Sequence, residues 1–212
     1  YGGRFLDPAV GELQDGIDIL VEEDRIKEVG PRLSAASATR IDLAGKTIMP
    51  GLIDSHVHVI ASLVNIAENS ALPSSLAALR AGRIMEAMLQ RGFTTVRDLG
   101  GADLGLVRGV EEGLIAGPRL VICGKALGMT GGHSDFRGRS DDRGLFDGRV
   151  GTLGRICDGV DAVRKAAREE IKGGAQFVKI MANGGVASPN DPNDALGFSR
   201  DEISATVEEA EM

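Results

Sequence analysis

From residue 47 onward the chain alternates short apolar runs with longer amphipathic runs, and this alternation constrains the fold more than any other feature. Predicted strands cover 47–57, 93–99, 119–124 and 175–182, and predicted helices cover 74–92, 102–115, 161–174 and 199–212. Parallel neighbouring strands need a crossover connection, which is usually a helix. Four consecutive strand–helix units therefore predict a parallel α/β fold, either a doubly wound sheet or half of an eight-stranded barrel.

Residues 1–49 follow a different pattern. The runs GIDILVEEDRIKEVG and ATRIDLAGKTIMP are short, alternate between apolar and polar residues, and are separated by turn residues. This pattern is typical of antiparallel strands. We therefore divide the chain into a small β unit, residues 1–49, and an α/β unit, residues 50–212.

Composition narrows the class of protein. The 212 residues are 42% apolar, enough for a substantial core, and the net charge of −7 lacks the basic excess that nucleic-acid binding needs. No apolar run resembles a signal peptide or a membrane span, so we expect a cytoplasmic protein with no membrane or nucleic-acid partner. Cys123 and Cys157 lie far apart without a C-x-x-C pattern, so we expect buried thiols.

The stretch PGLIDSHVHVI, residues 50–60, contains two of the three histidines of the chain. Side chains alternate along a strand, so Asp54, His56 and His58 are expected on one face. Imidazole nitrogens and carboxylate oxygens are zinc ligands, which makes this spacing suitable for a metal site. The alternative is a pair of surface histidines at a strand end, which the apolar neighbours and the preceding Pro50 and Gly51 disfavour.

Lys179, in FVKIMANGG, is flanked by apolar residues in the predicted fourth strand. A buried ammonium is costly, so this lysine must be paired, have a lowered pKa or be modified. Addition of carbon dioxide to the neutral amine would give a carbamate whose oxygens could bridge two cations. The residues alone favour the simpler alternative, a lysine at a strand end that extends to solvent.

Two long connections, 124–157 and 183–198, follow the carboxyl ends of strands, where parallel α/β folds build their active sites. His133 lies in the first of them, after the flexible Gly131 and Gly132. The charged residues 137–149 predict a solvated lid whose arginines could meet a substrate carboxylate. Arg97 and Asp98 end the second predicted strand, and they could form an ion pair on the rim or contact a substrate.

The pattern of Gly51, Asp54, His56 and His58, together with the TTVRD strand, the TGGH loop and the VKIMANGG strand, resembles the metal-dependent amidohydrolase superfamily. The likeness is to its imidazolonepropionase-like and Xaa-Pro dipeptidase-like branch. It implies a (β/α)8 TIM-type barrel, with the first four units in 50–212, beside a small β-sandwich whose N-terminal part is 1–49.

The resemblance also implies a site. His56, His58 and Lys179 would bind two divalent ions, which we expect to be zinc, and Lys179 would be N6-carboxylysine formed with carbon dioxide. Lys179 and His133 would be catalytic, and His133 and Arg97 would bind substrate. The expected reaction is hydrolysis of an amide or peptide bond in a dipeptide or N-acyl amino acid by a metal-activated hydroxide.

The same family pattern needs two further histidines and an aspartate from later strands, which these residues do not contain. We therefore expect the remaining barrel half on the same or another chain, a homo-oligomer, and no activity from the 212 residues alone. The chain begins at Tyr1 without a methionine and stops at Met212 within a predicted helix, which fits a piece of a longer product. The alternative is a non-catalytic half-barrel that binds a metal or a partner protein.

Overall fold

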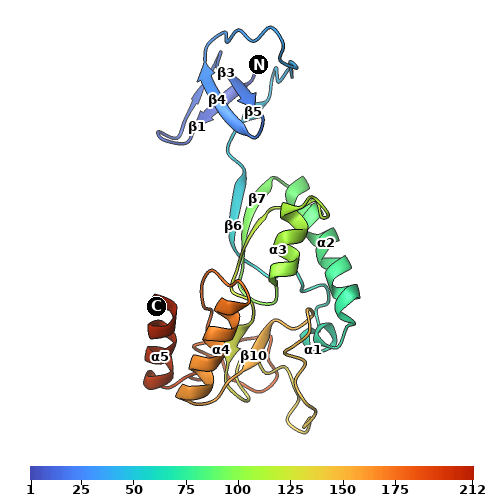
Figure 1. The fold of residues 1–212 in the computed structure, drawn as a ribbon, viewed down its shortest axis with the longest axis vertical. Helices are drawn as coiled ribbons and strands as arrows, with labels where there is room; N and C mark the ends of the chain where they lie inside the picture. The colour runs from blue at the N-terminus through green and yellow to red at the C-terminus, as the bar shows by residue number, and fades with distance from the viewer. The chain divides into compact units, whose positions relative to one another are not determined.

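The computed structural model describes residues 1–212 and divides them into two compact units, Tyr1–Gly51 and Leu52–Met212 (Figure 1). The predicted single strand 47–57 is wrong, because it is two strands, one in each unit. Strand β5 (Thr47–Ile48) pairs within the first unit, and strand β6 (Leu52–Val57) pairs within the second. Pro50 lies between them and has no N–H to continue a ladder.

The N-terminal unit contains two small sheets. Strand β1 (Arg4–Asp7) lies between β2 (Glu12–Gln14), which is antiparallel to it, and β5, which is parallel to it. Strands β3 (Asp18–Glu22) and β4 (Arg25–Gly30) form an antiparallel hairpin. The antiparallel prediction is thus confirmed for residues 16–30 and wrong for the pairing of residues 47–48, and a β-sandwich stays a prediction.

The second unit is built on a parallel sheet in the order β6-β7-β8, with β7 at Phe93–Asp98 and β8 at Arg119–Ile122. Helices α2 (Ser74–Gln90) and α3 (Leu104–Glu111) make the crossovers. A short helix that was not predicted, α1 (Ile66–Ser70), begins after Asn65, whose side chain accepts a hydrogen bond from the Glu68 amide. The predicted parallel sheet is confirmed for these three strands.

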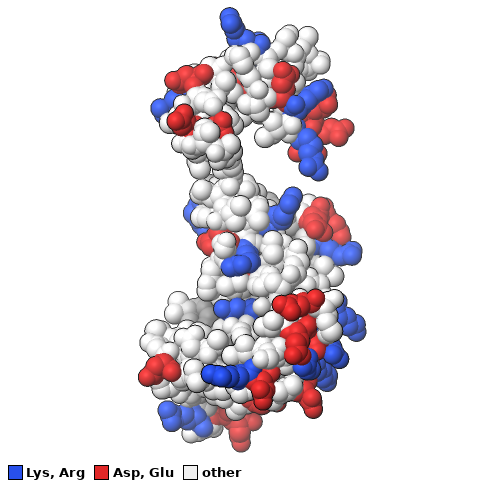
Figure 2. Space-filling model, turned by 90° about the vertical axis from the view of Figure 1, so that its left-hand side faces the viewer, with Lys and Arg blue, Asp and Glu red and all other residues white.

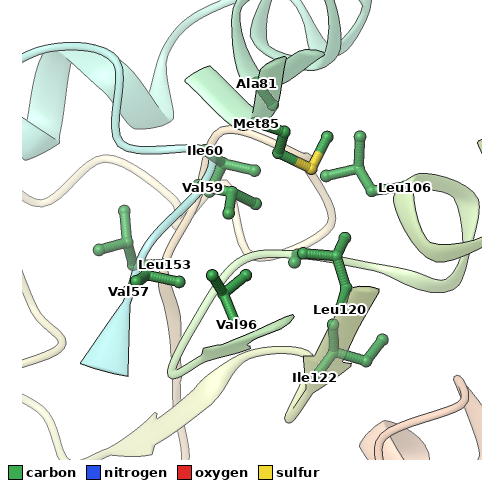
Figure 3. Close-up of a cluster of buried hydrophobic side chains, with 11 residues drawn as sticks. Val57, Val59, Ile60, Ala81, Met85, Val96, Leu106, Leu120, Ile122 and Leu153 are labelled. Atoms are coloured by element: carbon green, nitrogen blue, oxygen red, sulfur yellow. The ribbon is translucent and has the colours of Figure 1, made fainter. Parts of the chain in front are cut away.

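One face of this sheet carries the core. Figure 3 shows apolar side chains from the sheet meeting those of helices α2 and α3. The buried members are Val57, Val59, Ile60, Ala81, Met85, Val96, Ala102, Leu106, Leu120, Ile122 and Leu153. Because successive strand residues face opposite sides, this packing leaves the alternate residues of β6 and β7 on the other face of the sheet.

The connection 124–157 contains a parallel pair of short strands, β9 (Ala126–Gly128) and β10 (Gly154–Ile156), which were not predicted because three residues carry too little alternation. Helix α4 (Val160–Lys172) and helix α5 (Arg200–Glu211) follow. Helix α5 opens with the predicted capping box between Ser199 and Glu202. Ion pairs join α4 to α5, and Glu209, whose side chain is 1% exposed, accepts from Arg168 at 2.6 and 2.8 Å.

The predicted fourth strand, 175–182, is an extended segment with a single parallel bridge between Ile180 and Leu127. Three backbone bonds still follow the expected order: the Gln176 amide donates to Ile122, Leu127 donates to Lys179 and Met181 donates to Leu127. A regular ladder fails to form because its neighbour turns between β8 and β9, where Gly124 has a φ of 68°. The expectation of a buried regular strand around Lys179 is therefore wrong in this chain.

The surface carries both signs of charge. Figure 2 shows Lys and Arg interspersed with Asp and Glu over the face in view. None of the helices combines the length and the apolar character that a membrane crossing requires.

Candidate metal centre and substrate loops

His56 and His58 lie at the carboxyl end of β6, and their ring centres are 5.6 Å apart. The β6–β7 register shifts between Asp54 and Val57, so His58 lies just past the strand. Oδ1 of Asp54, the acid of the expected row, accepts a 3.0 Å hydrogen bond from the His56 amide. Partial burial lowers the pKa of His56, and the positive charges of His58 and Lys179 act in the same direction, which favours the neutral imidazole that binds metals.

His58 is held by the segment after β7. Its Nδ1 lies 3.1 Å from the carbonyl oxygen of Gly100, and because a carbonyl can only accept, Nδ1 carries the hydrogen and Nε2 keeps its lone pair. A Cβ at Gly100 would lie 2.5 Å from the Leu153 carbonyl oxygen, so any residue larger than glycine would clash with that backbone. Metal-binding histidines usually donate their second ring nitrogen in this way.

Asp98 fixes this segment. Its buried carboxylate accepts from the amides of Val59 at 2.7 Å, Gly100 at 2.9 Å and Ala102 at 3.2 Å. Burial raises the pKa of Asp98, and the three N–H donors and His58 oppose that shift. The segment that follows His58 and the segment after β7 that contacts its ring are therefore tied to one carboxylate.

Lys179 lies on the fourth segment, where its carbonyl accepts from Leu127 at 2.8 Å. Its side chain is half-buried, and its ammonium has no hydrogen-bond or ion-pair partner in the chain. The charge of Lys179 nevertheless influences the pKa of His56, so the structure brings these two predicted ligands into one neighbourhood.

Arg97 and Asp98 do not form the rim ion pair, because neighbouring strand residues face opposite sides of the sheet. Arg97 is exposed on the side opposite the apolar core. Its Nε donates to the Ser55 carbonyl at 2.9 Å, and its guanidinium lies 5.6 Å from the centre of the Phe177 ring. Its charge also lowers the pKa of His56, so Arg97 lies near the metal-ligand candidates.

His133 lies five residues beyond β9, at the carboxyl end of the strand that bridges to the Lys179 segment. Its Nδ1 lies 2.7 Å from the Ser188 hydroxyl and 3.7 Å from Oδ2 of Asp191. These partners belong to the second long connection, so the two predicted functional loops contact each other through His133. Neither partner was predicted, since the pairing depends on how two long loops meet.

Comparison with known proteins decides the family. The model of the amidohydrolase family matches residues 47–212, well over half of the chain. The chain belongs to the amidohydrolase family. The resemblance read from the motifs is thereby confirmed, and the family implies a TIM-barrel-type fold for the second unit.

Individual members of the family are similar to this chain. A crystal structure of a prolidase with N-methylphosphonate-L-proline is 50% identical with a TM-score of 0.95, over 99% of this chain and 52% of that one. A Xaa-Pro dipeptidase with bound methionine is 28% identical with a TM-score of 0.83, over 99% of this chain and 53% of that one. Ochratoxinase of Aspergillus niger is 34% identical over 175 residues, 77% of this chain and 36% of that protein. The chain spans about half the length of these structures, and the sequence match to ochratoxinase covers about a third of that protein.

The residues of this chain fit a divalent metal in part. The ring nitrogens of His56 make no hydrogen bond, Nε2 of His58 is free, and Lys179 Nζ has no partner. Zinc lies roughly 2.0–2.1 Å from an imidazole nitrogen. Two rings that share one ion can therefore have their centres up to roughly 6 Å apart. The ring centres of His56 and His58, 5.6 Å apart, are within that distance. No group of three or more His, Cys, Asp or Glu side chains is arranged to hold a metal in these residues, so the fit rests on the two imidazoles, and Lys179 would add oxygen ligands only as a carbamate.

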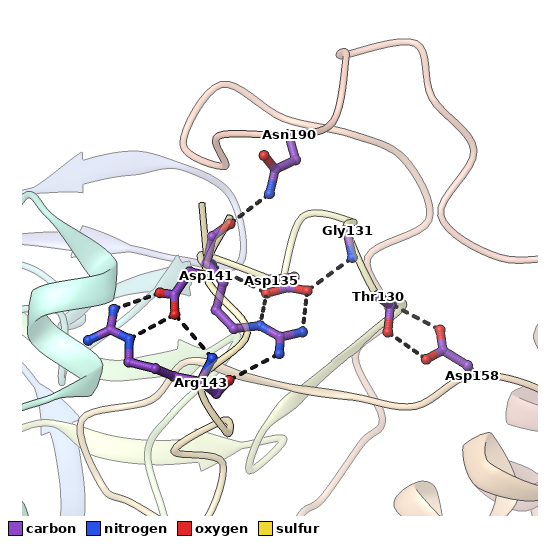
Figure 4. A network of polar contacts seen from close by, with 8 residues as sticks. Thr130, Gly131, Asp135, Asp141, Arg143, Asp158 and Asn190 are labelled. Atoms are coloured by element: carbon purple, nitrogen blue, oxygen red, sulfur yellow. Dashed lines mark hydrogen bonds and ion pairs between the residues drawn. The ribbon is translucent and has the colours of Figure 1, made fainter. Parts of the chain in front are cut away.

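The charged connection that was expected to be a solvated lid is held by its own ion pairs (Figure 4). Arg137 donates to both carboxylate oxygens of Asp135 at 2.8 Å, and Arg143 pairs with Asp141 at 2.6 and 2.8 Å. These contacts raise the pKa of both guanidinium groups and lower that of Asp141 to about 2. Two arginines that could have met a substrate carboxylate thus have carboxylate partners inside the loop.

Proposed function

We propose that the protein carrying this chain is a metal-dependent hydrolase of amide or peptide bonds, acting on a dipeptide or an N-acyl amino acid. One observation supports it most: His58 donates through Nδ1 to Gly100 and leaves Nε2 free beside His56, the arrangement expected of a histidine ligand. The similarity to a prolidase and a Xaa-Pro dipeptidase supports the substrate class.

In this proposal His56 and His58 hold one divalent ion, and Lys179 joins it to a second as N6-carboxylysine. Zinc is the expected metal, because imidazole nitrogens and carboxylate-like oxygens are its common ligands. When bound, such ions polarise a carbonyl and activate water. The neutral His56 imidazole, favoured by its lowered pKa, would be ready to bind without losing a proton.

His133 and Arg97 would bind the free carboxylate of the substrate. Both approach the carboxyl ends of the strands, His133 from the loop after β9 and Arg97 from β7. Arg97 has only the Ser55 carbonyl and the Phe177 ring as partners, so its guanidinium keeps donors for an anion. The other half of the barrel, and a homo-oligomer, belong to the same proposal.

The test uses the full-length protein with Xaa-Pro dipeptides and N-acyl amino acids, each as the free acid and as the C-terminal amide. We expect hydrolysis that stops on chelation and returns with zinc, and at least about tenfold lower kcat/KM for the amides, because a charge-assisted hydrogen bond is lost. Elemental analysis of active protein without a transition metal would refute the metal centre. Equal turnover of the free acid and the amide would refute only the proposed contact with the substrate carboxylate, and not the metal centre.

A further inference from the structure

Asp135 is a buried carboxylate two residues after His133, and the metal centre does not use it. Its side chain is 5% exposed. Oδ2 of Asp135 accepts a 3.0 Å hydrogen bond from the Gly131 amide, and the Asp135 amide donates to the Gly132 carbonyl at 2.8 Å. The second bond makes His133 one of the two central residues of a β-turn, and the first ties the residue before that turn to the residue that ends it.

Arg137 orients this carboxylate. Its Nε donates to Oδ1 and its Nη2 to Oδ2 of Asp135, both at 2.8 Å, which is the two-point pairing that an arginine fork gives. The hydrogen bonds from Arg137 lower the pKa of Asp135, and burial opposes that shift only in part, so the carboxylate is ionised at neutral pH. Both oxygens are occupied inside the loop, and Asp135 therefore acts on the chain around it.

The turn is tied to two other parts of the chain (Figure 4). The amide and hydroxyl of Thr130 donate to Asp158 at 2.9 and 2.7 Å, just before helix α4. The carbonyl of Arg137 accepts from Asn190 Nδ2 at 2.6 Å, in the second long connection. The backbone that carries His133 is therefore fixed relative to both neighbours through Asp135 and the bonds that flank it.

The imidazole itself has few contacts. Its Nδ1 lies 2.7 Å from the Ser188 hydroxyl, and a Cβ at Gly185 would lie 2.1 Å from its Cε1, so the ring packs against the backbone of the second connection. A ring held by one side chain and one glycine depends on the turn that presents it. Since a misplacement of about 1 Å can remove most of a directed contact, the turn determines whether His133 meets a ligand.

We propose that Asp135, oriented by Arg137, is a positioning residue that holds the turn carrying His133 where its imidazole meets the substrate carboxylate. The inference rests on the proposed function, which gives His133 that contact. Asp135 itself does not touch the substrate, because its two oxygens are hydrogen-bonded within the loop. Its effect should therefore appear in one quantity, the preference for a free-acid substrate over the corresponding amide.

Asp135→Asn is the main variant. The amide keeps the size of the side chain, but its NH2 group must face either the Gly131 amide or Arg137, so one of these contacts is lost in either orientation. Asp141→Asn is the matched control. Asp141 binds Arg143 with the same two-residue spacing, and it makes no hydrogen bond to the His133 turn.

The quantity measured on the full-length, metal-loaded protein is the ratio of kcat/KM for the free acid to kcat/KM for its C-terminal amide. The proposed function predicts a ratio of at least about tenfold in the parent, and Asp135→Asn should lower it to about threefold or less through a higher KM for the free acid. Asp141→Asn should leave the ratio within about twofold of the parent, because the His133 contact is kept. In a His133→Asn background, Asp135→Asn should lower the ratio no further.

A second measurement does not depend on activity. Hydrogen exchange of the backbone amides 130–135, followed by mass spectrometry, should be about tenfold faster in Asp135→Asn and unchanged in Asp141→Asn, because only the first loosens the turn. If the parent hydrolyses no amide while exchange changes in this way, the proposed function fails and the role of Asp135 in holding the turn stands. Unchanged exchange in Asp135→Asn, or an equal loss of kcat/KM for acid and amide, would overturn the positioning role.

Arg137→Met provides a second route if Asp135→Asn does not fold. It keeps the Asp135 carboxylate and its bond to the Gly131 amide but removes the orienting pair. The acid-to-amide ratio should fall and exchange should rise, as in Asp135→Asn. No change in either quantity would overturn the proposal.

Discussion

The two sides of the candidate metal centre are held in different ways. On the His58 side, Asp98 ties three backbone amides together, and Gly100 fixes the imidazole. On the Lys179 side, the backbone makes a single bridge to β9, and the ammonium has no partner in the chain. The first side is held by backbone hydrogen bonds to one buried carboxylate, and the second is an extended segment held by a few backbone bonds.

This difference has a chemical consequence. A ligand that is already oriented loses little conformational entropy when it binds an ion, whereas a long, unpaired side chain must be ordered at that moment. We therefore expect the histidine pair to determine whether the first ion binds. Lys179 would then depend on its modification and on the ions themselves to become ordered.

The largest effect is expected from His56→Ala with His58→Ala. Removing both imidazoles takes away the two proposed histidine ligands, including His58 that Gly100 orients, so kcat/KM should fall at least about a thousandfold, because the ions stabilise charge by several kcal/mol. Metal content, measured by elemental analysis, should fall with it while the circular dichroism spectrum is kept. A variant that retained both metal and activity would place the metal centre elsewhere.

Lys179→Ala tests the Lys179 side of the centre. We expect a loss of about a hundredfold or more in kcat/KM, because one bridging ligand is missing while the histidine pair remains. Short carboxylic acids added to the assay should restore part of the activity by supplying oxygens in place of the carbamate. Full activity without additives would refute the bridging role of Lys179.

Asp98→Asn tests the frame behind His58. The amide group would turn an N–H toward a backbone N–H, so the free energy of unfolding should fall by about 1–3 kcal/mol. Metal affinity should fall about 10–100-fold, since Gly100 would hold His58 less firmly. Denaturant unfolding and a metal titration measure the two separately. Lower stability with unchanged affinity would mean that His58 is oriented without Asp98.

The sequence predicted the histidine side of the centre better than the lysine side, and the reason is physical. The positions of His56 and His58 follow from local strand alternation, which a short stretch encodes. The turn at Gly124 and the resulting loss of a regular fourth strand depend on how the third strand meets its neighbour, which no local pattern reveals. For the same reason β9 and β10 were missed inside a connection read as a loop.

In the two long loops, 124–157 and 183–198, contacts between distant residues were even harder to predict from the sequence. His133 was singled out from the TGGH motif, but its contacts with Ser188 and Asp191 join residues more than fifty positions apart. The segment 137–149 was predicted to be a solvated lid whose arginines could meet a substrate carboxylate, whereas Arg137 and Arg143 pair with Asp135 and Asp141, two residues before each of them. Spacing of two residues between an acid and an arginine was a signal that could have predicted those pairs.

The smallest effect is expected from Ser199→Ala, at the start of the helix that follows the Lys179 segment and its loop. Ser199 caps α5, and Glu202 accepts from Ser199 and also from the Gly159 amide before α4. Loss of the cap should cost about 1 kcal/mol of stability, seen as a lower melting temperature, with kcat/KM unchanged. These bonds lower the pKa of Glu202, so its contribution is full above the ordinary glutamate pKa of about 4.3 and is lost as the pH falls through the lowered value. The difference between parent and variant should therefore shrink in acid. A marked fall in kcat/KM would instead show that the position of Lys179 depends on the anchoring of α5.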